Sequence, residues 1–449
     1  MMRVKPLTFH KGGVHPQAAK LSASVPIETL PVPDEAVILL GQHIGAPAKP
    51  VVNKGDHVVV GQLLAESGGF VSANIHSSVS GTVSKIDGVV DASGYKKPAI
   101  FIKTEGDEWD SSIDRSAQLD TSLALQPKEM LGLLQKAGIV GMGGATFPTH
   151  VKLSVPEGKR AEFLIVNGVE CEPYLTADHR LMLEAPEQIL VGTQILAKVL
   201  GSPKVIIAIE LNKPDAIALL RSKAEAMHLD VTVQPLKVKY PQGGEKQLID
   251  ACVGRQVPPG KLPIDVGAVV QNVGTVYAVY EAVQKHKPLF ERVLTVTGKN
   301  LPTPKNYRVR MGTPISQVIA AAGGLPDDTG KVISGGPMMG KALKNVDAPV
   351  TKGTSGILLM PETMALRPVA QHCIRCSKCS FGCPMGLEPF LLVRLAKRSR
   401  LEDLEHEDVM SCIECGSCSF TCPAGIPLLD FIRMGKAATG AMLRARRAK

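Results

Sequence analysis

The order of hydrophobic and polar residues divides this chain into stretches with different periods. Between residues 28 and 105, short apolar runs alternate with turns rich in glycine and aspartate, which predicts a domain of β-strands. Residues 51–62, for example, are typical of two strands joined by a Gly-Asp turn. Residues 1–27 show no regular period and are expected to form an irregular N-terminal arm. The polar stretch 105–126 is expected to be a linker.

Residues 127–290 alternate between helical and strand periods, which favours a Rossmann-like parallel α/β sheet covered by helices. Ligands of such sheets bind beyond the carboxyl ends of the strands, so the loops at that edge are candidate sites. The expected elements are a helix at 128–137, a strand at 163–166, a helix at 188–200, a strand at 204–210 and a helix at 214–228.

Two further units complete the chain. Residues 291–361 return to short strands around one helix at 314–322, which predicts a small α+β module. Within this module, the glycine-rich stretch 334–340 is expected to be a tight packing loop. Residues 365–449 contain eight of the ten cysteines and end in a basic amphipathic stretch, 427–449, which is expected to be helical.

One cysteine pattern occurs twice near the C-terminus, as C-x2-C-x2-C-x3-C followed by proline. This spacing is typical of bacterial proteins with two [4Fe–4S] clusters, in which the fourth cysteine of each motif binds the other cluster. The sequence therefore predicts a ferredoxin-type dicluster domain with crossed ligands. The expected ligand sets are Cys373, Cys376, Cys379 and Cys422 for one cluster, and Cys412, Cys415, Cys418 and Cys383 for the other.

Zinc and disulfide bonds are the alternative uses of these cysteines. Paired C-x2-C motifs also bind structural zinc, but a zinc site takes four ligands and does not need two triplets that are each followed by C-x3-C-P. Disulfides require an oxidising compartment, and the start of the sequence does not predict a secretory signal. The iron–sulfur interpretation is therefore preferred.

The charge and the hydropathy narrow the possible partners. The formal net charge of +9 suits acidic electron carriers or an anionic membrane surface. Nucleic acid is not an expected partner, because aromatic residues make up only 4% of the chain and are not interleaved with the basic ones. Since no apolar run reaches the length of a transmembrane helix, we expect a soluble or peripheral protein.

Two segments of the β domain, 51–62 and 76–83, resemble the hammerhead of biotinyl and lipoyl carrier domains, which is a barrel-sandwich fold. Carrier domains place a modified lysine at the hairpin tip between these segments. The stretch 63–75 of this chain contains no lysine. We therefore expect a docking or structural role for this domain, and not that of a swinging arm.

A glycine-rich loop forms a second candidate site. Gly141, Gly143 and Gly144 would let backbone N–H groups approach a phosphate, and Lys152 would neutralise its charge. The loop does not match the Walker pattern, because no Gly-Lys-Ser/Thr closes it.

Two acidic residues follow the strand at 163–166, at the expected ligand edge of the sheet. Glu170 and Glu172 would bond ribose hydroxyls or a nicotinamide amide there. Alternatively, they only favour the start of the next helix through its dipole.

Four segments of the α/β region resemble the NADH- and flavin-binding subunit of respiratory complex I. With the cysteine motifs, they make the chain similar over nearly its whole length to the C subunits of the Rnf electron transport complex. That family joins a hammerhead-like domain, a flavin domain, a β-grasp module and a dicluster domain. A sister family, the A subunits of the sodium-pumping NADH:quinone oxidoreductase, lacks the cluster cysteines. The four segments are residues 141–152, residues 167–173 with 178–180, residues 240–245 and residues 271–275.

The resemblance implies a role for individual residues in binding FMN and NAD(H). It departs from complex I at Val169, where that subunit has aspartate, at Gly274, where it has glutamate, and at Gly244, which replaces one of two glutamates. These departures affect the expected contacts to NADH more than the residues expected to hold the FMN phosphate. By position, Gly141, Gly143, Gly144 and Lys152 would hold the FMN phosphate, Asn167, Tyr240, Asn272 and Thr275 would line the flavin, and Phe147, Glu170, Glu172 and Glu245 would face the dinucleotide.

The activity that the resemblance implies is that of a ferredoxin:NAD oxidoreductase. Nicotinamide moves hydride and iron–sulfur clusters move single electrons, so a flavin that does both is expected between them. Partner subunits would receive electrons from reduced ferredoxin and move Na+ or H+ across a membrane, with this chain peripheral on its cytoplasmic face. Hydride transfer does not strictly need an acid or base, so no catalytic residue is predicted.

Two other functions fit the same residues. One is a flavin-free scaffold whose clusters only connect partner proteins. The other is a soluble NADH dehydrogenase subunit that feeds a hydrogenase-like acceptor.

Overall fold

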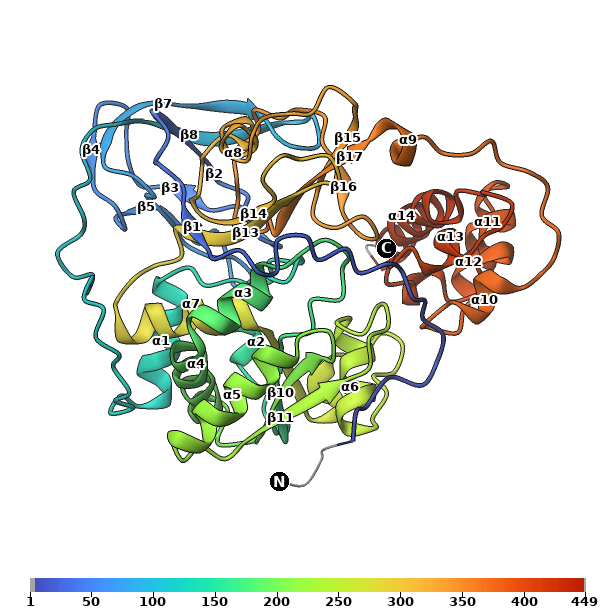
Figure 1. The fold of residues 1–449 in the computed structure, drawn as a ribbon, viewed down its shortest axis with the longest axis horizontal. Coiled ribbons are helices and arrows are strands. Elements are labelled where there is room, and N and C mark those ends of the chain that lie inside the picture. The colour runs from blue at the N-terminus through green and yellow to red at the C-terminus, as the bar shows by residue number, and fades with distance from the viewer. Residues whose placement is uncertain (1–4, 448–449) are drawn as a thin grey trace.

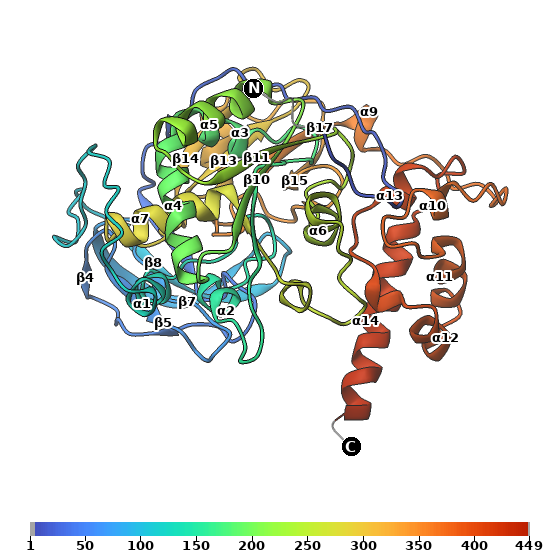
Figure 2. The same ribbon diagram turned by 90° about the horizontal axis from the view of Figure 1, so that it is seen from below.

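The computed structural model describes residues 5–447. Four units follow one another along the chain in Figure 1: a β unit (blue), an α/β unit (green to yellow), an α+β unit (orange) and a helical unit (red). The predicted fold class is therefore confirmed. The β and α+β units lie together on one side of the α/β unit, and the helical unit lies at one end of the molecule (Figures 1 and 2).

The β unit is a barrel sandwich of two small sheets, with strand orders β2-β8-β7-β4 and β3-β5-β6. Apolar side chains of both sheets, such as Ile38 and Leu64, are fully buried. The turn expected within 51–62 lies at residues 54–55, where Gly55 has a φ of +95°, and the flanking strands are shorter than predicted. The strands are β2 (Glu35–Leu39), β3 (Lys49–Pro50), β4 (His57–Val58), β5 (Leu63–Glu66), β6 (Ile75–His76), β7 (Gly81–Val90) and β8 (Lys96–Thr104).

The α/β unit contains the predicted parallel sheet, with strand order β11-β10-β9-β12. Its register pairs Asn272 with Asn167, so the two strands that carry these residues end side by side at one edge. The two strands expected from the sequence appear within one residue of their predicted bounds. The strands are β9 (Phe163–Asn167), β10 (Lys204–Glu210), β11 (Val231–Leu236) and β12 (Ala268–Asn272).

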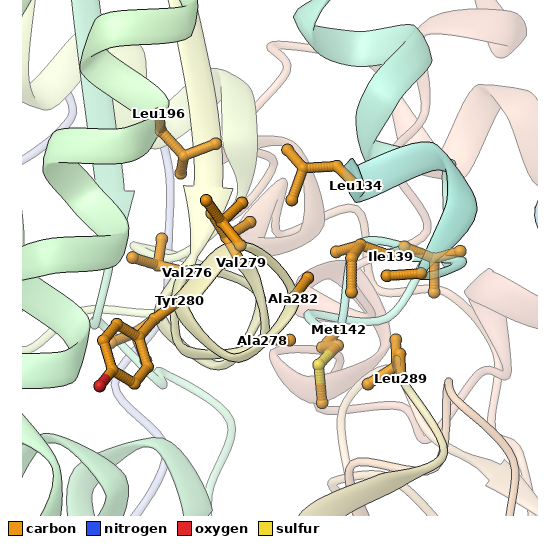
Figure 3. Close-up of a cluster of buried hydrophobic side chains, with 14 of the residues drawn as sticks. Leu134, Ile139, Met142, Leu196, Val276, Ala278, Val279, Tyr280, Ala282 and Leu289 are labelled. Atoms are coloured by element: carbon orange, nitrogen blue, oxygen red, sulfur yellow. The ribbon is translucent and has the colours of Figure 1, made fainter. Parts of the chain in front are cut away.

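Helices cover this sheet and form the largest core of the protein. Figure 3 shows Val279 of α7 packed between Leu196 of α4 and Leu134 of α1, with Met142 close by. This packing fixes the chain that follows α1, where the glycine-rich loop begins. The helices are α1 (Pro127–Lys136), α2 (Thr149–Leu153), α3 (Ala177–Glu184), α4 (Pro186–Val199), α5 (Pro214–Ala226), α6 (Glu245–Val253), the 3-10 turn η1 (Pro263–Val266) and α7 (Val273–Gln284).

The α+β unit is built on a six-stranded sheet with the order β1-β14-β13-β17-β15-β16. Its first strand comes from the N-terminal side of the chain, because Glu28 pairs with Tyr307 in parallel register. Residue 28, which the sequence places at the start of the β domain, therefore joins another sheet. The elements are β1 (Glu28–Thr29), β13 (Glu291–Thr297), β14 (Lys305–Arg310), α8 (Ile315–Ala321), β15 (Thr329–Ser334), β16 (Lys341–Ala342), β17 (Gly356–Pro361) and α9 (Glu362–Ala365).

The helical unit carries the cysteine motifs. Its long last helix agrees with the amphipathic helix expected at 427–449, of which residues 448–449 lie outside the described part. It packs on two shorter helices, and Ile432 and Leu404 are buried between them. No helix within residues 5–447 combines the length and apolar character needed to cross a membrane. The elements are α10 (Lys378–Phe381), α11 (Pro389–Ala396), α12 (Leu401–His406), η2 (Val409–Ser411), α13 (Ser417–Phe420) and α14 (Leu428–Arg447).

The N-terminal arm is a strap that connects three of the four units (Figure 1). Leu7 extends the edge of the parallel sheet beside β11, through hydrogen bonds with Pro235 and Lys237. The N–H of Gly13 then donates to the carbonyl of Gly382 in the helical unit, at 3.1 Å. Farther along, β1 joins the α+β sheet. The N-terminal arm thus has no regular local pattern, although its backbone is hydrogen-bonded to distant parts of the chain.

A buried lysine holds three units together at the other side of the molecule. Lys352, in the connection between β16 and β17, donates from Nζ to the carbonyl oxygens of Asn74 (2.8 Å) and Gly138 (2.7 Å). Burial lowers the pKa of Lys352 to about 7. Asn74 lies in the hairpin tip of the barrel sandwich and Gly138 directly after α1. The tip is therefore anchored close to the glycine-rich loop.

Candidate cofactor-binding sites

The glycine-rich loop connects α1 to α2 and opens to solvent. The N–H of Gly141 donates to the carbonyl of Phe147 (2.9 Å) and closes the turn. The N–H of Met142 donates to Thr275 Oγ1 (2.9 Å), which fastens the turn to α7. Gly143 and Gly144 are exposed, and Gly144 has a φ of +129° with open space where a Cβ would lie.

Polar groups of this loop fit a bound phosphate. Within residues 5–447, the N–H groups of Gly143, Gly144 and Ala145 have no hydrogen-bond partner, and neither has the buried hydroxyl of Thr149. Unpaired backbone donors in a glycine turn favour an anion. The donor set therefore fits the phosphate of FMN, as the sequence predicts.

Two asparagines at the ends of parallel strands complete this edge. Asn272 Oδ1 accepts hydrogen bonds from the N–H groups of Gly274 (2.9 Å) and Thr275 (3.4 Å) and so caps α7. Asn167 Nδ2 donates to the carbonyl of Gly243 (2.9 Å). A Cβ on Gly143 would come within 3.2 Å of Asn272, so the loop lies directly against the capping residue. The structure thus brings these predicted residues together.

Lys152 and Glu245, which the sequence assigns to phosphate and dinucleotide binding, form an ion pair. Lys152 Nζ lies 2.5 Å from Glu245 Oε1, and both side chains are partly exposed. Lys152 belongs to α2 and Glu245 begins α6. A phosphate at the glycine turn would share Lys152 with this carboxylate. The energetic cost of weakening the ion pair would be small, because both side chains are partly exposed.

The two glutamates after β9 bind backbone N–H groups of the protein. Glu170 accepts from Asp178 (2.8 Å) and His179 (3.2 Å) at the start of α3, which agrees with the helix-capping alternative. Glu172 accepts from Met338 (3.1 Å) and Met339 (2.7 Å). Both carboxylates therefore bond neighbouring backbone N–H groups, and their role in facing the dinucleotide stays a prediction.

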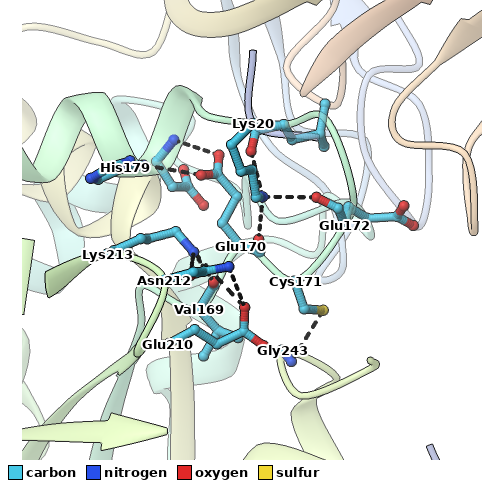
Figure 4. Close-up of polar contacts among 12 residues, drawn as sticks. Lys20, Val169, Glu170, Cys171, Glu172, His179, Glu210, Asn212, Lys213 and Gly243 are labelled. Carbon is cyan, nitrogen blue, oxygen red and sulfur yellow. Dashed lines mark hydrogen bonds and ion pairs between the residues drawn. The ribbon is translucent and has the colours of Figure 1, made fainter. Parts of the chain in front are cut away.

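Two lysines that the sequence did not single out hold the same stretch (Figure 4). Lys20, from the arm, donates from Nζ to the carbonyl oxygens of Glu170 (2.8 Å), Glu172 (2.9 Å) and Leu175 (2.6 Å). Lys213 Nζ donates to the carbonyl of Val169 (2.7 Å). Burial, with the charge of Lys20 nearby, lowers the pKa of Lys213 to about 8. The sequence does not mark these contacts, because Lys20 lies about 150 residues from its partners and Lys213 lies 44 residues from Val169.

A small polar cavity lies beneath the asparagine-capped helix. Asp178 Oδ2 accepts from Asn272 Nδ2 (2.7 Å), and burial together with Glu170 raises the pKa of Asp178 well above its usual range. Arg292 is buried beside it, and this burial lowers its pKa to about 10. Both line the cavity with Met142 and Gly274. Asp178 therefore connects the predicted flavin-lining residue Asn272 to this cavity.

The pKa of Glu172 gives the site a pH dependence. Burial raises this pKa from 4.5 to about 7, although the two methionine N–H groups oppose the shift. The folded protein therefore holds a proton that the unfolded chain releases, so the free energy of unfolding falls as pH rises from about 4.5 to 7. The contribution is on the order of 3 kcal/mol at most. Thermal unfolding measured at pH 5.5 and at pH 8 tests this. Between these two pH values, Glu172→Gln should lose less stability than the original chain. An equal loss in both proteins would contradict this.

Four cysteines from both motifs line one cavity of the helical unit. Three belong to the second motif and the fourth is the last cysteine of the first. This is the grouping that crossed ligation predicts for one of the clusters. The apolar side chains of Leu387, Leu392 and Ile432 surround it, which would keep water from a cluster. The four cysteines are Cys383, Cys412, Cys415 and Cys418.

The other four predicted ligands differ in their exposure to solvent. Cys379 and Cys422 are partly buried against its apolar core, whereas Cys373 and Cys376 are exposed. Residues 5–447 contain no group of three or more His, Cys, Asp or Glu side chains placed to hold a single metal ion. A four-iron cube differs from such a site because each thiolate binds a separate iron.

The cavity lined by Cys415 faces the α/β unit. Tyr240, which the sequence expects at the flavin, is buried, and its hydroxyl donates to the carbonyl of Cys415 (2.9 Å). A Cβ on Gly416 would come within 2.9 Å of the carbonyl of Met338. Met338 lies in the loop that binds Glu172, so this predicted packing loop joins three units. The residues after β9 and the inner cysteines are thus connected through Tyr240 and Met338.

The fold and these sites define an iron–sulfur protein with an FMN-binding domain, a class that transfers electrons. Four family models match the chain: the Nuo51 FMN-binding domain over residues 134–281, the RnfC barrel sandwich hybrid domain over 7–107, the SLBB domain over 293–342 and the 4Fe-4S dicluster domain over 369–426. These matches support the cofactors expected from the sequence.

Relatives cover nearly the whole chain. It is 47% identical over 403 residues to the C subunit of the proton-translocating ferredoxin:NAD(+) oxidoreductase complex of Clostridium ljungdahlii, covering 89% of this chain and 87% of that protein. It is 44% identical over 412 residues to the C subunit of the corresponding Na(+)-translocating complex of Acetobacterium woodii, covering 91% and 92%. The chain therefore belongs to the family of C subunits of Rnf-type ion-translocating ferredoxin:NAD(+) oxidoreductase complexes.

A solved structure with a similar fold is an NAD+-reducing [NiFe]-hydrogenase in the H2-reduced state. The identity is 21% and the TM-score is 0.50, covering 72% of this chain and 66% of the other. This likeness concerns the fold alone.

Proposed function

We propose that this chain exchanges electrons between NAD(H) and one-electron carriers, as the C subunit of an Rnf-type complex whose partner subunits translocate ions. The observation that carries the proposal is a glycine turn with unpaired N–H groups at the edge of a parallel sheet, together with a cavity lined by four cysteines that Tyr240 joins to the same α/β unit. Electron transfer from a two-electron donor to one-electron acceptors needs both a flavin site and a cluster site in one chain.

The protein residues hold and orient the cofactors. Gly143 and Gly144 would accept the FMN phosphate against their backbone N–H groups, with Lys152 as its counter-charge. Asn272 and Thr275 fix the turn to the N-terminus of α7. When bound, FMN supplies the conversion between hydride and single electrons. The fixed turn would keep its position constant relative to the inner cysteines.

The two clusters would act in a defined order. Cys383, Cys412, Cys415 and Cys418 line the cavity beside Tyr240, so we assign the inner cluster to this set. The set that contains the exposed Cys373 would hold the outer cluster, where electrons pass to or from a partner. Burial and hydrogen bonds to sulfur tune such clusters.

The surroundings of the outer set support contact with a partner subunit. Ile374 and Phe381, within or next to the first motif, are 69% and 79% exposed. Arg375 and Lys378 are exposed beside them. An apolar centre with basic neighbours fits an acidic iron–sulfur partner. A peripheral position on the cytoplasmic face of the membrane is part of the proposal, supported by the relatives, which are subunits of ion-translocating complexes.

Cofactor analysis of anaerobically purified protein tests the function. We expect one FMN and about eight irons per chain, because two four-iron cubes hold eight, and bleaching of the flavin absorbance by NADH. About eight irons without flavin would favour the scaffold alternative. About four irons or fewer would reject the dicluster assignment. Activity without membrane association in cells that hold the partner subunits would favour a soluble NADH dehydrogenase.

A further inference from the structure

The barrel sandwich keeps the hairpin tip of a carrier domain but has no lysine in it. The tip, residues 67–74, joins β5 to β6. It is internally bonded: the N–H of Ser67 donates to Asn74 Oδ1 (2.9 Å) and the N–H of Gly68 donates to Ser72 Oγ (2.8 Å). Such bonds hold the loop in one conformation. The tip is therefore a rigid element and not a mobile arm.

The neighbouring loop after β2 packs on the tip. Ser72 Oγ donates to the carbonyl of Ala46 (2.8 Å), and the N–H of Ala46 donates to the carbonyl of Val71 (3.0 Å). The N–H of Ala73 donates to His43 Nε2 (3.2 Å). The two loops thus form one surface at the end of the barrel sandwich.

This surface is fastened to the α/β unit on both sides of the glycine-rich loop. Asn74 Nδ2 donates to the carbonyl of Lys136 at the end of α1 (3.1 Å). The N–H of Ile44 donates to the carbonyl of Thr146 within the loop (3.3 Å). The imidazole of His150, in α2, lies against the backbone of Phe70. The tip is therefore placed directly beside the predicted cofactor cradle.

Two large apolar side chains of this surface are exposed. Phe70, at the apex of the tip, is 75% exposed, and Ile44 is 50% exposed. Backbone contacts hold both residues next to the loop, while their side chains contribute little to the core. Gly143, Gly144 and Ala145 are exposed in the same loop. An aromatic ring in a rigid, bonded loop beside an open phosphate cradle is positioned to contact a ligand.

We propose that Phe70 and Ile44 bind the adenine of NAD(H), so that the barrel sandwich forms one wall of the dinucleotide site. This inference rests on the proposed function. The asparagines at the strand ends mark the flavin side of the site, where the nicotinamide has to lie. The bond between Ile44 and Thr146 places this surface beside the glycine loop, so a dinucleotide that extends from that edge across the loop would reach Phe70 and Ile44. Adenine presents a flat apolar face that stacks on aromatic rings.

The proposal explains why the tip has a phenylalanine on the surface and needs no lysine. A carrier domain requires a flexible attachment at its tip, whereas a binding wall requires a rigid one. The bonds of Ser67, Asn74 and Ser72 supply that rigidity. Phe147, in the glycine loop, is partly buried. The domain would then determine affinity for the adenosine half of the substrate.

Ligand binding by Phe70→Ala in the full chain with its cofactors tests this. We expect the Kd of NADH and of ADP-ribose, measured by calorimetry under anaerobic conditions, to rise about tenfold. The Kd of reduced nicotinamide mononucleotide, which lacks adenosine, should not change. Ile44→Ala should show the same pattern with a smaller rise, and Phe70→Trp should retain binding. Tyr95→Ala removes a similarly exposed aromatic side chain (67% exposed) from the β7–β8 hairpin of the same barrel sandwich and should leave all three values unchanged.

The outcomes separate this inference from the proposed function. If the original chain binds neither NADH nor ADP-ribose, the proposed function and this inference both fail. If the original chain and Phe70→Ala bind NADH and ADP-ribose equally well, only the inference fails. The exposed surface of the tip would then be assigned to contact with a partner subunit. An equal rise for the mononucleotide would show a general distortion of the site and would also reject the adenine assignment. Flavin and iron content confirm that each variant is folded.

Discussion

Replacing Cys383 with serine is expected to abolish the inner cluster while the first three cysteines of its own motif keep the outer one. The physical reason is the cavity, which groups Cys383 with Cys412, Cys415 and Cys418 of the second motif. Iron should fall from about eight to about four per chain. NADH should still bleach the flavin, but the outer cluster should no longer be reduced, because the relay beside Tyr240 is missing. Electron paramagnetic resonance of NADH-reduced protein measures this.

The matched variant is Cys422→Ser, which should give the opposite pattern. The outer cluster should be lost, and NADH should still reduce the inner one. Both variants remove one thiolate and one predicted cluster, so they differ only in which cluster they affect. Loss of the outer cluster in Cys383→Ser, with the inner one intact, would show that each motif binds its own cluster.

Replacing Gly144 with valine is expected to weaken FMN binding by at least about tenfold. A β-branched side chain at a φ of +129° strains the turn, and its methyl groups would occupy the open space in front of the unpaired N–H groups. The phosphate would then be unable to reach these donors. Flavin content after purification, and the Kd for added FMN from fluorescence quenching, measure the effect.

Gly158→Val is the control for strain alone. Gly158 also has a positive φ, of +78°, and no atom lies within 4 Å of the position of its Cβ. It lies in the loop before β9, away from the glycine turn. This variant should lose stability and keep its flavin. If Gly144→Val retains FMN as well as Gly158→Val does, the phosphate lies elsewhere.

The sequence was most informative where a function depends on local spacing. Strands such as β10 (Lys204–Glu210) could be predicted because a buried parallel strand is a short continuous apolar run between helices. The glycine turn could be located because closely spaced glycines let the backbone approach a ligand, and Gly144 has a φ of +129°. The cysteines of each motif lie close together in the chain, so their spacing identifies the kind of cluster.

The sequence was least informative about residues whose partners lie far away. Glu170 and Glu172 were expected at the dinucleotide, but their carboxylates bind the start of α3 and the Met338–Met339 backbone. No local pattern marks Lys20, because its partners are about 150 residues distant in the sequence. The expected helix at residues 427–449 needed only its own pattern and was correct over the described part.

The sequence alone determined that this protein has a glycine turn suited to a phosphate at the edge of an α/β sheet and two cysteine sets with the spacing of cluster ligands. These features follow from backbone conformation and ligand spacing, which act over a few residues. Only the tertiary structure decided that Cys415, and not the exposed Cys373, faces Tyr240. It also decided that the lysine-free hairpin tip lies beside the cradle. Contacts of this kind depend on how whole units pack together, and short stretches of sequence carry no record of that packing.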